Sequence, residues 1–256
     1  MEELPYDIMH NIIYDKLDPR VVNKCLQTSR AFHILTAKER HMIKCIVKGG
    51  MMYCIINNCL RGLIYCYKHK YNTQNYSKVY LFEKACEQGH IQIIKWMLDT
   101  YGTYIFGIDY VSFRNTCIDG KTKAVQWLIK NYSENLQSFY KDKFHAINNI
   151  VLICCGQGYL DIIKILINTF KNIDIHFGND YMLCLACKGG YINVLKYLIE
   201  IHDQQCKKIG CNEIDIHNNN DYWMRHAKKN NYIEIVNWLK QNYDNFDWKT
   251  INEWIY

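Results

Sequence analysis

Apolar residues recur along most of the chain in pairs that are three to four residues apart. Two such sets are Ile93, Ile94, Met97, Leu98 and Val194, Leu195, Leu198, Ile199. This spacing places the side chains of a set on one side of a helix. A shorter helical segment precedes each set and ends at glycine or asparagine, which tolerate the left-handed conformation at a helix C-terminus. The pattern predicts pairs of short helices joined by tight turns.

The helix pairs form an internal repeat. Five segments align without gaps; they begin at Phe82, Phe113, Val151, Leu183 and Met224, and a weaker copy spans residues 52–71. We assign the anchor position between the two helices to Cys59, Gly89, Gly120, Gly158, Gly190 and Asn231. One such unit cannot bury its apolar face alone, so the repetition predicts an array of stacked units.

The first and last units differ from the central ones. The last apolar position of the second helix is Leu98, Ile129, Ile167 and Ile199 in the central copies. We assign Lys68 to this position in the first copy and Lys240 in the last. A terminal repeat faces water on one side and should be polar there. The pattern therefore predicts about six units with caps at both ends.

Two connections between units are longer than the others, around residues 133–149 and 203–220. We expect loops there. Insertions in repeat arrays often lie on the binding face. Long surface insertions also cost little free energy and are tolerated without a role. Both interpretations stay open for these two segments.

Composition narrows the class of protein. The 256 residues are 49% hydrophobic and 22% charged, which is typical of a soluble globular protein. No apolar run approaches the roughly 18 residues of a membrane span, and the acidic start is unlike a secretory signal. Thirteen cysteines, an odd number without a tight framework, indicate reduced thiols. We expect a cytoplasmic monomer that binds no membrane, in the host cytoplasm if the chain is viral.

The recurring cysteines have a packing explanation. Cys86, Cys117, Cys155 and Cys187 occupy one repeat position, where a small buried side chain suits the contact between helices. The Cys184–Cys187 pair has a C-x-x-C spacing but lies in the same helix, so packing is favoured over redox or metal chemistry. His202, Cys206, Cys211 and His217 are zinc-type ligands, yet their irregular spacing favours chance. We predict no metal and no cofactor.

Motifs for catalysis and nucleic-acid binding are weak or missing. The sequence has no phosphate-binding glycine loop, no H-E-x-x-H and no G-x-S-x-G, so we predict a non-enzymatic protein with no catalytic residue. The net charge of +6 is a mild basic excess. Lysines at 207, 208, 228 and 229 together with aromatic residues could suggest single-strand binding. The aromatic residues Trp96, Trp127, Tyr197 and Trp238 recur at one repeat position, which favours packing.

The repeat resembles the ankyrin repeat. Residues 179–200 carry the resemblance through Leu183, Ala186, Gly190, Val194, Leu195, Leu198 and Ile199, and Gly89-His90 supplies the family's Gly-His pair. The family's Thr-Pro-Leu-His tetrapeptide is replaced by Tyr181–Cys184. The resemblance covers roughly residues 52–243. It implies an all-α helical-repeat solenoid that binds a target protein through its loop tips and first helices; the sequence does not name that target.

Both prolines of the chain, Pro5 and Pro19, fall in the N-terminal segment. Each fits the start of a helix, with Asp18 as the N-cap before Pro19. Three short helices are expected in this segment. They are too few for a comfortable independent core, so the small bundle should dock on the repeats, on a partner, or on both.

The same segment resembles an F-box. The matching residues are Leu4, Pro5, Asp7, Ile8, Ile12, Ile13, Leu17, Asp18, Pro19, Val22, Cys25, Ser29, Arg30 and Phe32. The resemblance implies that a Skp-type adaptor of a cullin ubiquitin ligase would contact Leu4, Pro5, Ile8, Ile12, Leu17 and Pro19. Tyr6 and His10 depart from the family pattern. The alternative is a bundle that only caps the first repeat.

These observations give one domain scheme and one main hypothesis. We divide the chain into an F-box-like segment (1–40), about six degenerate ankyrin-like repeats (41–243) and a closing helix (244–256). This arrangement is similar to a large group of ankyrin-repeat proteins in mimivirus-type giant DNA viruses. The hypothesis is an adaptor that holds a target protein near a ubiquitin ligase. The alternative is an ankyrin-repeat binding module without a ubiquitin link.

Overall fold

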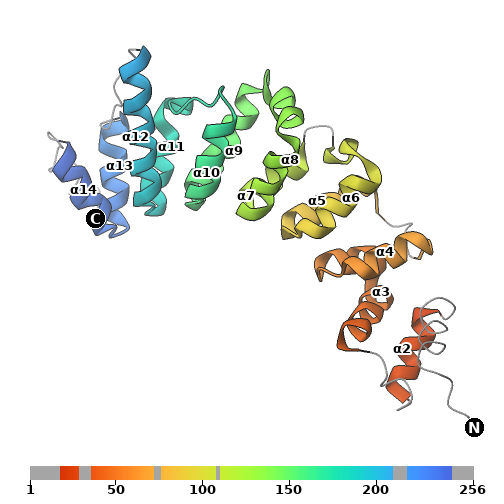
Figure 1. Ribbon diagram of the computed structural model, residues 1–256. Coiled ribbons are helices and arrows are strands. Elements are labelled where there is room, and N and C mark those ends of the chain that lie inside the picture. Colours follow the sequence, from red (N-terminus) through yellow and green to blue (C-terminus); the bar gives the residue numbers. More distant parts are fainter. Residues whose placement is uncertain (1–17, 29–35, 72–75, 108–109, 210–217, 244–256) are drawn as a thin grey trace, which may run out of the picture. The chain divides into compact units, whose positions relative to one another are not determined.

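The computed structural model describes residues 18–28, 36–71, 76–107, 110–209 and 218–243, and these residues contain helices and no strand. Helix α2 (Pro19–Thr28) is followed by helix pairs (Figure 1). The pairs are α3 (Ala37–Ile56) with α4 (Leu60–Lys68), α5 (Lys78–Gln88) with α6 (Ile91–Tyr101), α7 (Val111–Ile118) with α8 (Thr122–Tyr140), α9 (Phe144–Gln157) with α10 (Leu160–Thr169), α11 (Phe177–Gly189) with α12 (Ile192–Ile209), and α13 (Asn218–Lys229) with α14 (Ile233–Asn242). A 3₁₀ helix, η3 (Thr103–Phe106), follows α6. The all-α repeat architecture predicted from the sequence is confirmed.

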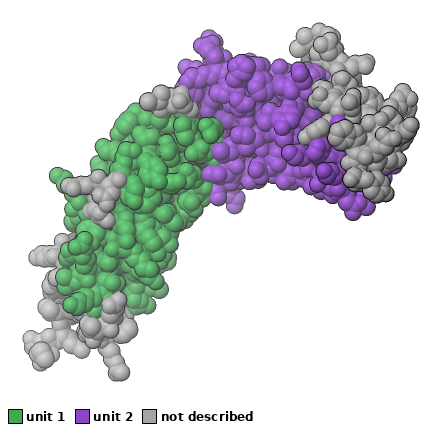
Figure 2. Space-filling model, turned by 180° about the vertical axis from the view of Figure 1, so that it is seen from behind, with its two compact units in different colours: residues 1–115 green, residues 116–256 purple. Residues whose placement is uncertain are grey.

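The chain divides into two compact units, residues 1–115 and 116–256 (Figure 2). In the first unit α2 packs on α3, α3 packs on α4 and α5, and η3 lies against α5 and α6. Helix α3 begins with a capping box between Thr36 and Glu39 and changes direction at Gly49 and Gly50, where φ and ψ leave the helical region. Its second half, after this kink, is the first helix of the first repeat.

In the second unit the first helices of successive repeats pack side by side. Helix α9 contacts α11, and α11 contacts α13; α8 and α9 both pack on α10. The aliphatic pairs predicted from the sequence form the core, because Ile162, Ile163, Val194 and Leu195 are at most 1% exposed. Burial of such pairs from both sides is what holds one repeat to the next.

The turn between the two helices has one geometry in every repeat. Gly89, Gly120, Gly158, Gly190 and Asn231 all have positive φ, between 57° and 79°. The N–H of the following residue bonds to the carbonyl five residues earlier, as in His90 N to Ala85 O at 3.2 Å and Tyr232 N to Ala227 O at 2.8 Å. This bond satisfies an orphan carbonyl at the end of the first helix.

The alignment of the first repeat is corrected by one residue. The left-handed residue there is Asn58, with φ of 53°, and not Cys59, which is the N-cap of α4 with φ of −100°. The last apolar position of α4 is then Tyr67 instead of Lys68. Tyr67 is 42% exposed and packs edge-on against Trp96 and Tyr101. The polar residue expected at this end of the array is therefore absent from that position.

The first long connection is helical, so the predicted loop is wrong. Residues 133–140 extend α8, which bends at Tyr132, and residues 144–149 extend the start of α9. The second connection is helical as far as Ile209, the end of α12, and begins again with α13 at Asn218. Apolar residues placed at helical spacing explain the first case, since Leu136 and Tyr140 are four residues apart and at most 1% exposed.

Candidate protein-binding surface

The first helices of the second unit expose an apolar strip. Ile153 on α9 is 36% exposed and Tyr181 on α11 is 42% exposed, although most apolar residues of these helices are buried. Leu185 lies one turn after Tyr181 on α11 and occupies the same repeat position as Ile153 on α9. A Cβ atom added at Gly156 of α9 would lie 3.6 Å from the Leu185 side chain. Because α9 and α11 pack side by side, these side chains form one strip across two repeats.

The strip continues into a positively charged region. Lys188 and Lys229 are exposed near the ends of α11 and α13. His226, at the repeat position of Leu185, has a lowered pKa because of burial and because Lys188, Lys229 and Arg225 repel its proton. The imidazole is therefore neutral at pH 7, and the lysines supply the charge. A partner segment with apolar residues followed by acidic residues would complement this surface.

The first unit presents tyrosines at the corresponding place. Tyr80 on α5 occupies the repeat position of Tyr181, is 39% exposed, and stacks on Tyr76 with 5.6 Å between ring centroids. Lys84 lies over the Tyr80 ring and pairs with Glu87 at 2.6 Å. The pKa of Glu83 is raised by burial and by the charge of Glu87. Tyrosine is enriched at protein interfaces, and polar residues surround the apolar centre of such a surface.

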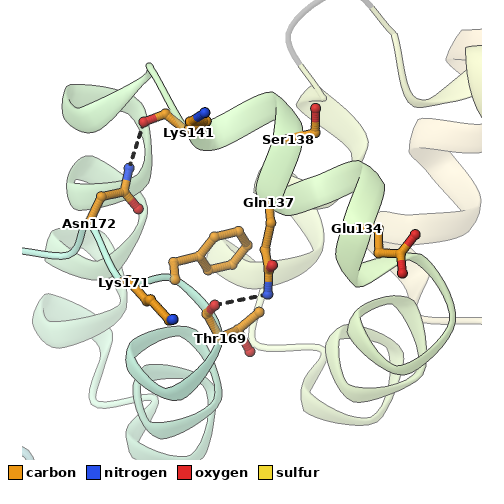
Figure 3. Close-up of a pocket in the computed structure, with 8 residues that line it drawn as sticks. Glu134, Gln137, Ser138, Lys141, Thr169, Lys171 and Asn172 are labelled. Carbon is orange, nitrogen blue, oxygen red and sulfur yellow. Dashed lines mark hydrogen bonds between the residues drawn. The ribbon is translucent and has the colours of Figure 1, made fainter.

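A pocket lies beside the extended part of α8 in the second unit (Figure 3). Its volume is about 450 Å³, and it is lined by Glu134, Gln137, Ser138, Lys141, Thr169, Phe170, Lys171 and Asn172. Gln137 Nε2 donates to Thr169 O at 3.1 Å, and Asn172 Nδ2 donates to Lys141 O at 3.5 Å. The lining offers hydrogen-bond donors and acceptors but no cysteine or histidine, so it suits a polar group of a partner.

Aromatic residues of the second helices serve packing. Tyr197 and Trp238 are half-buried, and a lysine of the preceding repeat lies over each ring. Lys164 Nζ is 5.4 Å from the Tyr197 ring centroid, and Lys196 Nζ is 5.8 Å from that of Trp238. These cation–π contacts engage the lysines within the array. They support the packing interpretation of the recurring aromatic residues over a stacking surface for nucleic-acid bases.

The recurring cysteines are fully buried. Cys86, Cys117, Cys155 and Cys187 are all 0% exposed. Burial raises the pKa of Cys154 to about 12 and that of Cys184 to about 11, and it also raises the pKa of Cys155 and Cys187. Such thiols stay protonated at pH 7 and are poor nucleophiles. This environment agrees with packing as the role of the Cys184–Cys187 pair.

Several predicted residues fall outside the described part of the chain. Leu4, Pro5, Ile8, Ile12 and Leu17 of the F-box-like segment lie there, as do Cys211, His217 and the closing helix at 244–256. Pro19 is described and begins α2, with Asp18 Oδ1 accepting from Arg20 N at 2.7 Å. His202 is buried, pairs with Asp203 and packs edge-on against His176.

Within the described residues, no helix combines the length and the apolar character needed to cross a bilayer.

Comparison with known proteins agrees with this geometry. Residues 113–208 and 151–250 match the family model for ankyrin repeats (3 copies), and together they cover more than half of the chain. A protein named "Putative ankyrin repeat protein L56", from Acanthamoeba polyphaga mimivirus, is 19% identical over 153 residues. That match covers 48% of this chain and 24% of the relative, so the chain spans about a quarter of the relative's length. The helix pairs, the left-handed turns and the family match together show that the chain belongs to the ankyrin-repeat family, whose arrays are protein-interaction modules.

Proposed function

We propose that the chain is a non-catalytic adaptor. Its repeats bind a target protein through the strip of Ile153, Tyr181 and Leu185, and its F-box-like segment recruits a Skp-type adaptor of a cullin ubiquitin ligase. The adaptor needs no catalytic residue, because holding the target near the ligase raises its effective concentration there.

The exposed strip is the observation that carries the first half of this proposal. Contiguous apolar patches on the surface of a folded domain mark interaction sites, and aromatic anchors dominate protein interfaces. Tyr80 and Tyr181 occupy the same repeat position and are both exposed. Two repeats, one in each compact unit, therefore offer an aromatic anchor at the same position of the first helix.

The second half rests on the sequence pattern of residues 4–35. It is supported by the start of α2, where Asp18 caps the helix and Pro19 is its first residue. Val21 on this helix is 49% exposed, so part of α2 is accessible to a partner. A Skp-type adaptor would cover such apolar side chains.

A second candidate, the capping bundle, is favoured by contacts of the same helix. Val22 is 1% exposed against α3. Arg20 Nε donates to the Tyr71 hydroxyl at 3.1 Å, which ties α2 to the last residue of the first repeat. In this alternative the N-terminal bundle shields the repeats and recruits no ligase.

Capture by a purified Skp-type adaptor separates the two candidates. We expect the wild-type chain to be retained and a Leu4→Ala/Pro5→Ala variant to be lost, while Tyr104→Ala, a change at a 61% exposed residue of η3, is retained. No retention of the wild type, or equal retention of the double variant, would leave the capping bundle as the function of this segment.

The target-binding half is tested in the same capture format. Proteins recovered from a host lysate with the wild-type chain should be depleted when Ile153→Ala and Tyr181→Ala are combined. Ile233→Ala is the matched control, because Ile233 is 59% exposed on a second helix. Equal recovery with all three chains would place the target contact elsewhere.

A further inference from the structure

Sulfur and imidazole groups converge in the first repeat. His41 and Cys45 lie one turn apart on the first half of α3, and Cys59 caps α4. His41 Nε2 is 3.5 Å from Cys45 Sγ. The nearest ligand atoms of His41, Cys45 and Cys59 all lie within 4.8 Å of one another. Two further buried thiols, Cys54 and Cys66, adjoin this trio.

The other repeats fill this space with hydrocarbon. The positions equivalent to Gly62 are Ile93, Ala124, Ile162, Val194 and Ile235, and those equivalent to Cys66 are Met97, Leu128, Leu166, Leu198 and Leu239. Only the first repeat has glycine and cysteine at these two positions. Replacing two core side chains by the smaller glycine and cysteine costs stability unless another interaction compensates. The presence of both Gly62 and Cys66 therefore indicates that an interaction other than aliphatic packing stabilises this repeat.

Gly62 gives the sulfur atoms room to approach. A Cβ atom there would lie 2.8 Å from Cys54 Sγ and 3.0 Å from Cys59 Sγ. The turn holds the same two residues together, because Cys59 N donates to Cys54 O at 2.7 Å. The thiols of Cys54 and Cys59 thus face one space that a side chain at residue 62 would fill.

The trio is accessible to an ion from one side. His41 is exposed, whereas Cys45 and Cys59 are buried, so the cluster opens to solvent on the histidine side.

We propose that His41, Cys45 and Cys59, with Cys54 as the fourth ligand, bind one zinc ion. Three cysteines and one histidine are a common structural zinc set, and tetrahedral zinc holds its sulfur ligands about 3.8 Å apart. The ligand atoms of His41, Cys45 and Cys59 lie within 4.8 Å of one another, and the Cys54 thiol would turn toward them to complete the set. Each ligating thiol releases its proton to solvent as the ion binds. The ion would clamp the first half of α3 to α4 across the bend at Gly49 and Gly50.

The site is tested on the full chain, reduced and stripped of metal. Added Co²⁺ should give the visible bands of tetrahedral coordination and a thiolate charge-transfer band with the intensity of three thiolates. Zn²⁺ should displace it at one ion per chain and raise the melting temperature, since a ligand that binds only the folded state stabilises it. Cys45→Ser, Cys59→Ser and His41→Asn should each weaken Zn²⁺ binding by at least about tenfold.

The matched controls are Cys86→Ser, a buried thiol of the recurring packing position in the same unit, and His69→Asn, a histidine stacked on Tyr65. Both should keep the cobalt spectrum and the Zn²⁺ affinity. If a variant of a buried cysteine fails to fold, His41→Asn still tests the zinc site, because His41 is exposed and its substitution leaves the core intact. A wild-type chain without tetrahedral cobalt bands, or equal Zn²⁺ affinity in His41→Asn and His69→Asn, would overturn the proposal.

Discussion

At the scale of single residues, the left-handed position between the two helices meets two requirements at once. It needs positive φ, which glycine adopts without penalty and asparagine tolerates. In the second unit it also needs an empty side, because a tyrosine of the next repeat packs there. A Cβ atom would lie 2.7 Å from the Tyr159 ring at Gly120 and 2.8 Å from the Tyr232 ring at Gly190. This double requirement explains why glycine recurs in the middle of the array.

Gly158→Ala should therefore destabilise the chain by roughly 1–2 kcal/mol, because its φ is 75° and its Cβ would meet the Tyr191 ring. Urea unfolding followed by circular dichroism measures the change. The control is Gly156→Ala in the same helix, where the nearest side-chain atom is 3.6 Å away. That change should be neutral or stabilise by up to about 1 kcal/mol. Equal effects of the two substitutions would contradict the argument.

At the scale of elements, the extension of α8 and α9 is fastened to the next repeat by side-chain amides. Asn148 Nδ2 donates to Phe144 O at 2.8 Å and to Asn172 O at 3.4 Å, while Asn148 Oδ1 accepts from Asp174 N at 2.9 Å. Tyr140 packs edge-on against Phe170. These contacts position the residues that line the pocket in Figure 3.

Asn148→Ala should lower the free energy of unfolding by about 1–3 kcal/mol, because Asn148 is fully buried and its partners would lose their hydrogen bonds. Asn149→Ala, at the exposed neighbouring residue, should change it by less than about 0.5 kcal/mol. Chemical denaturation of both variants is the measurement. A small effect at Asn148 would mean that the extension is held mainly by the Tyr140–Phe170 contact.

At the scale of the whole molecule, the chain forms two compact units, and within each unit the helices of adjacent repeats pack on one another. In such arrays, stability is close to a sum of repeat and nearest-neighbour terms. A substitution in one repeat should therefore destabilise that repeat and its direct neighbours only. A zinc ion in the first repeat would act on α3 and α4, while the apolar strip belongs to α9 and α11.

Hydrogen exchange should show this locality in the Gly158→Ala variant. We expect faster exchange of backbone amides in α9, α10 and α11, and unchanged exchange in α4, α5 and α6, because opening of one repeat breaks only its adjacent interfaces. Mass spectrometry of peptides from both units gives the comparison. Faster exchange throughout α4 to α6 would show that the array opens as one cooperative body.

The sequence by itself determined the helix pairs, their order and the turn residues, because these depend on local spacing: apolar pairs four residues apart and a residue that accepts positive φ. It also located the start of α2 at Asp18 and Pro19, where capping is local. Local patterns did not determine the alignment of the first repeat to within one residue, since Asn58 and Cys59 both stand at the turn between its helices.

Only the tertiary structure decided the rest. It made residues 133–140 and 144–149 helical, and there Leu136 is buried and Tyr140 packs on Phe170 of the following repeat. It placed the exposed Ile153 and Tyr181 and the half-buried Leu185 in one strip. It also brought His41 and Cys45 to Cys59, residues that irregular spacing along the chain does not connect. Such groupings depend on which elements pack side by side, and long-range packing is not encoded in any single short segment.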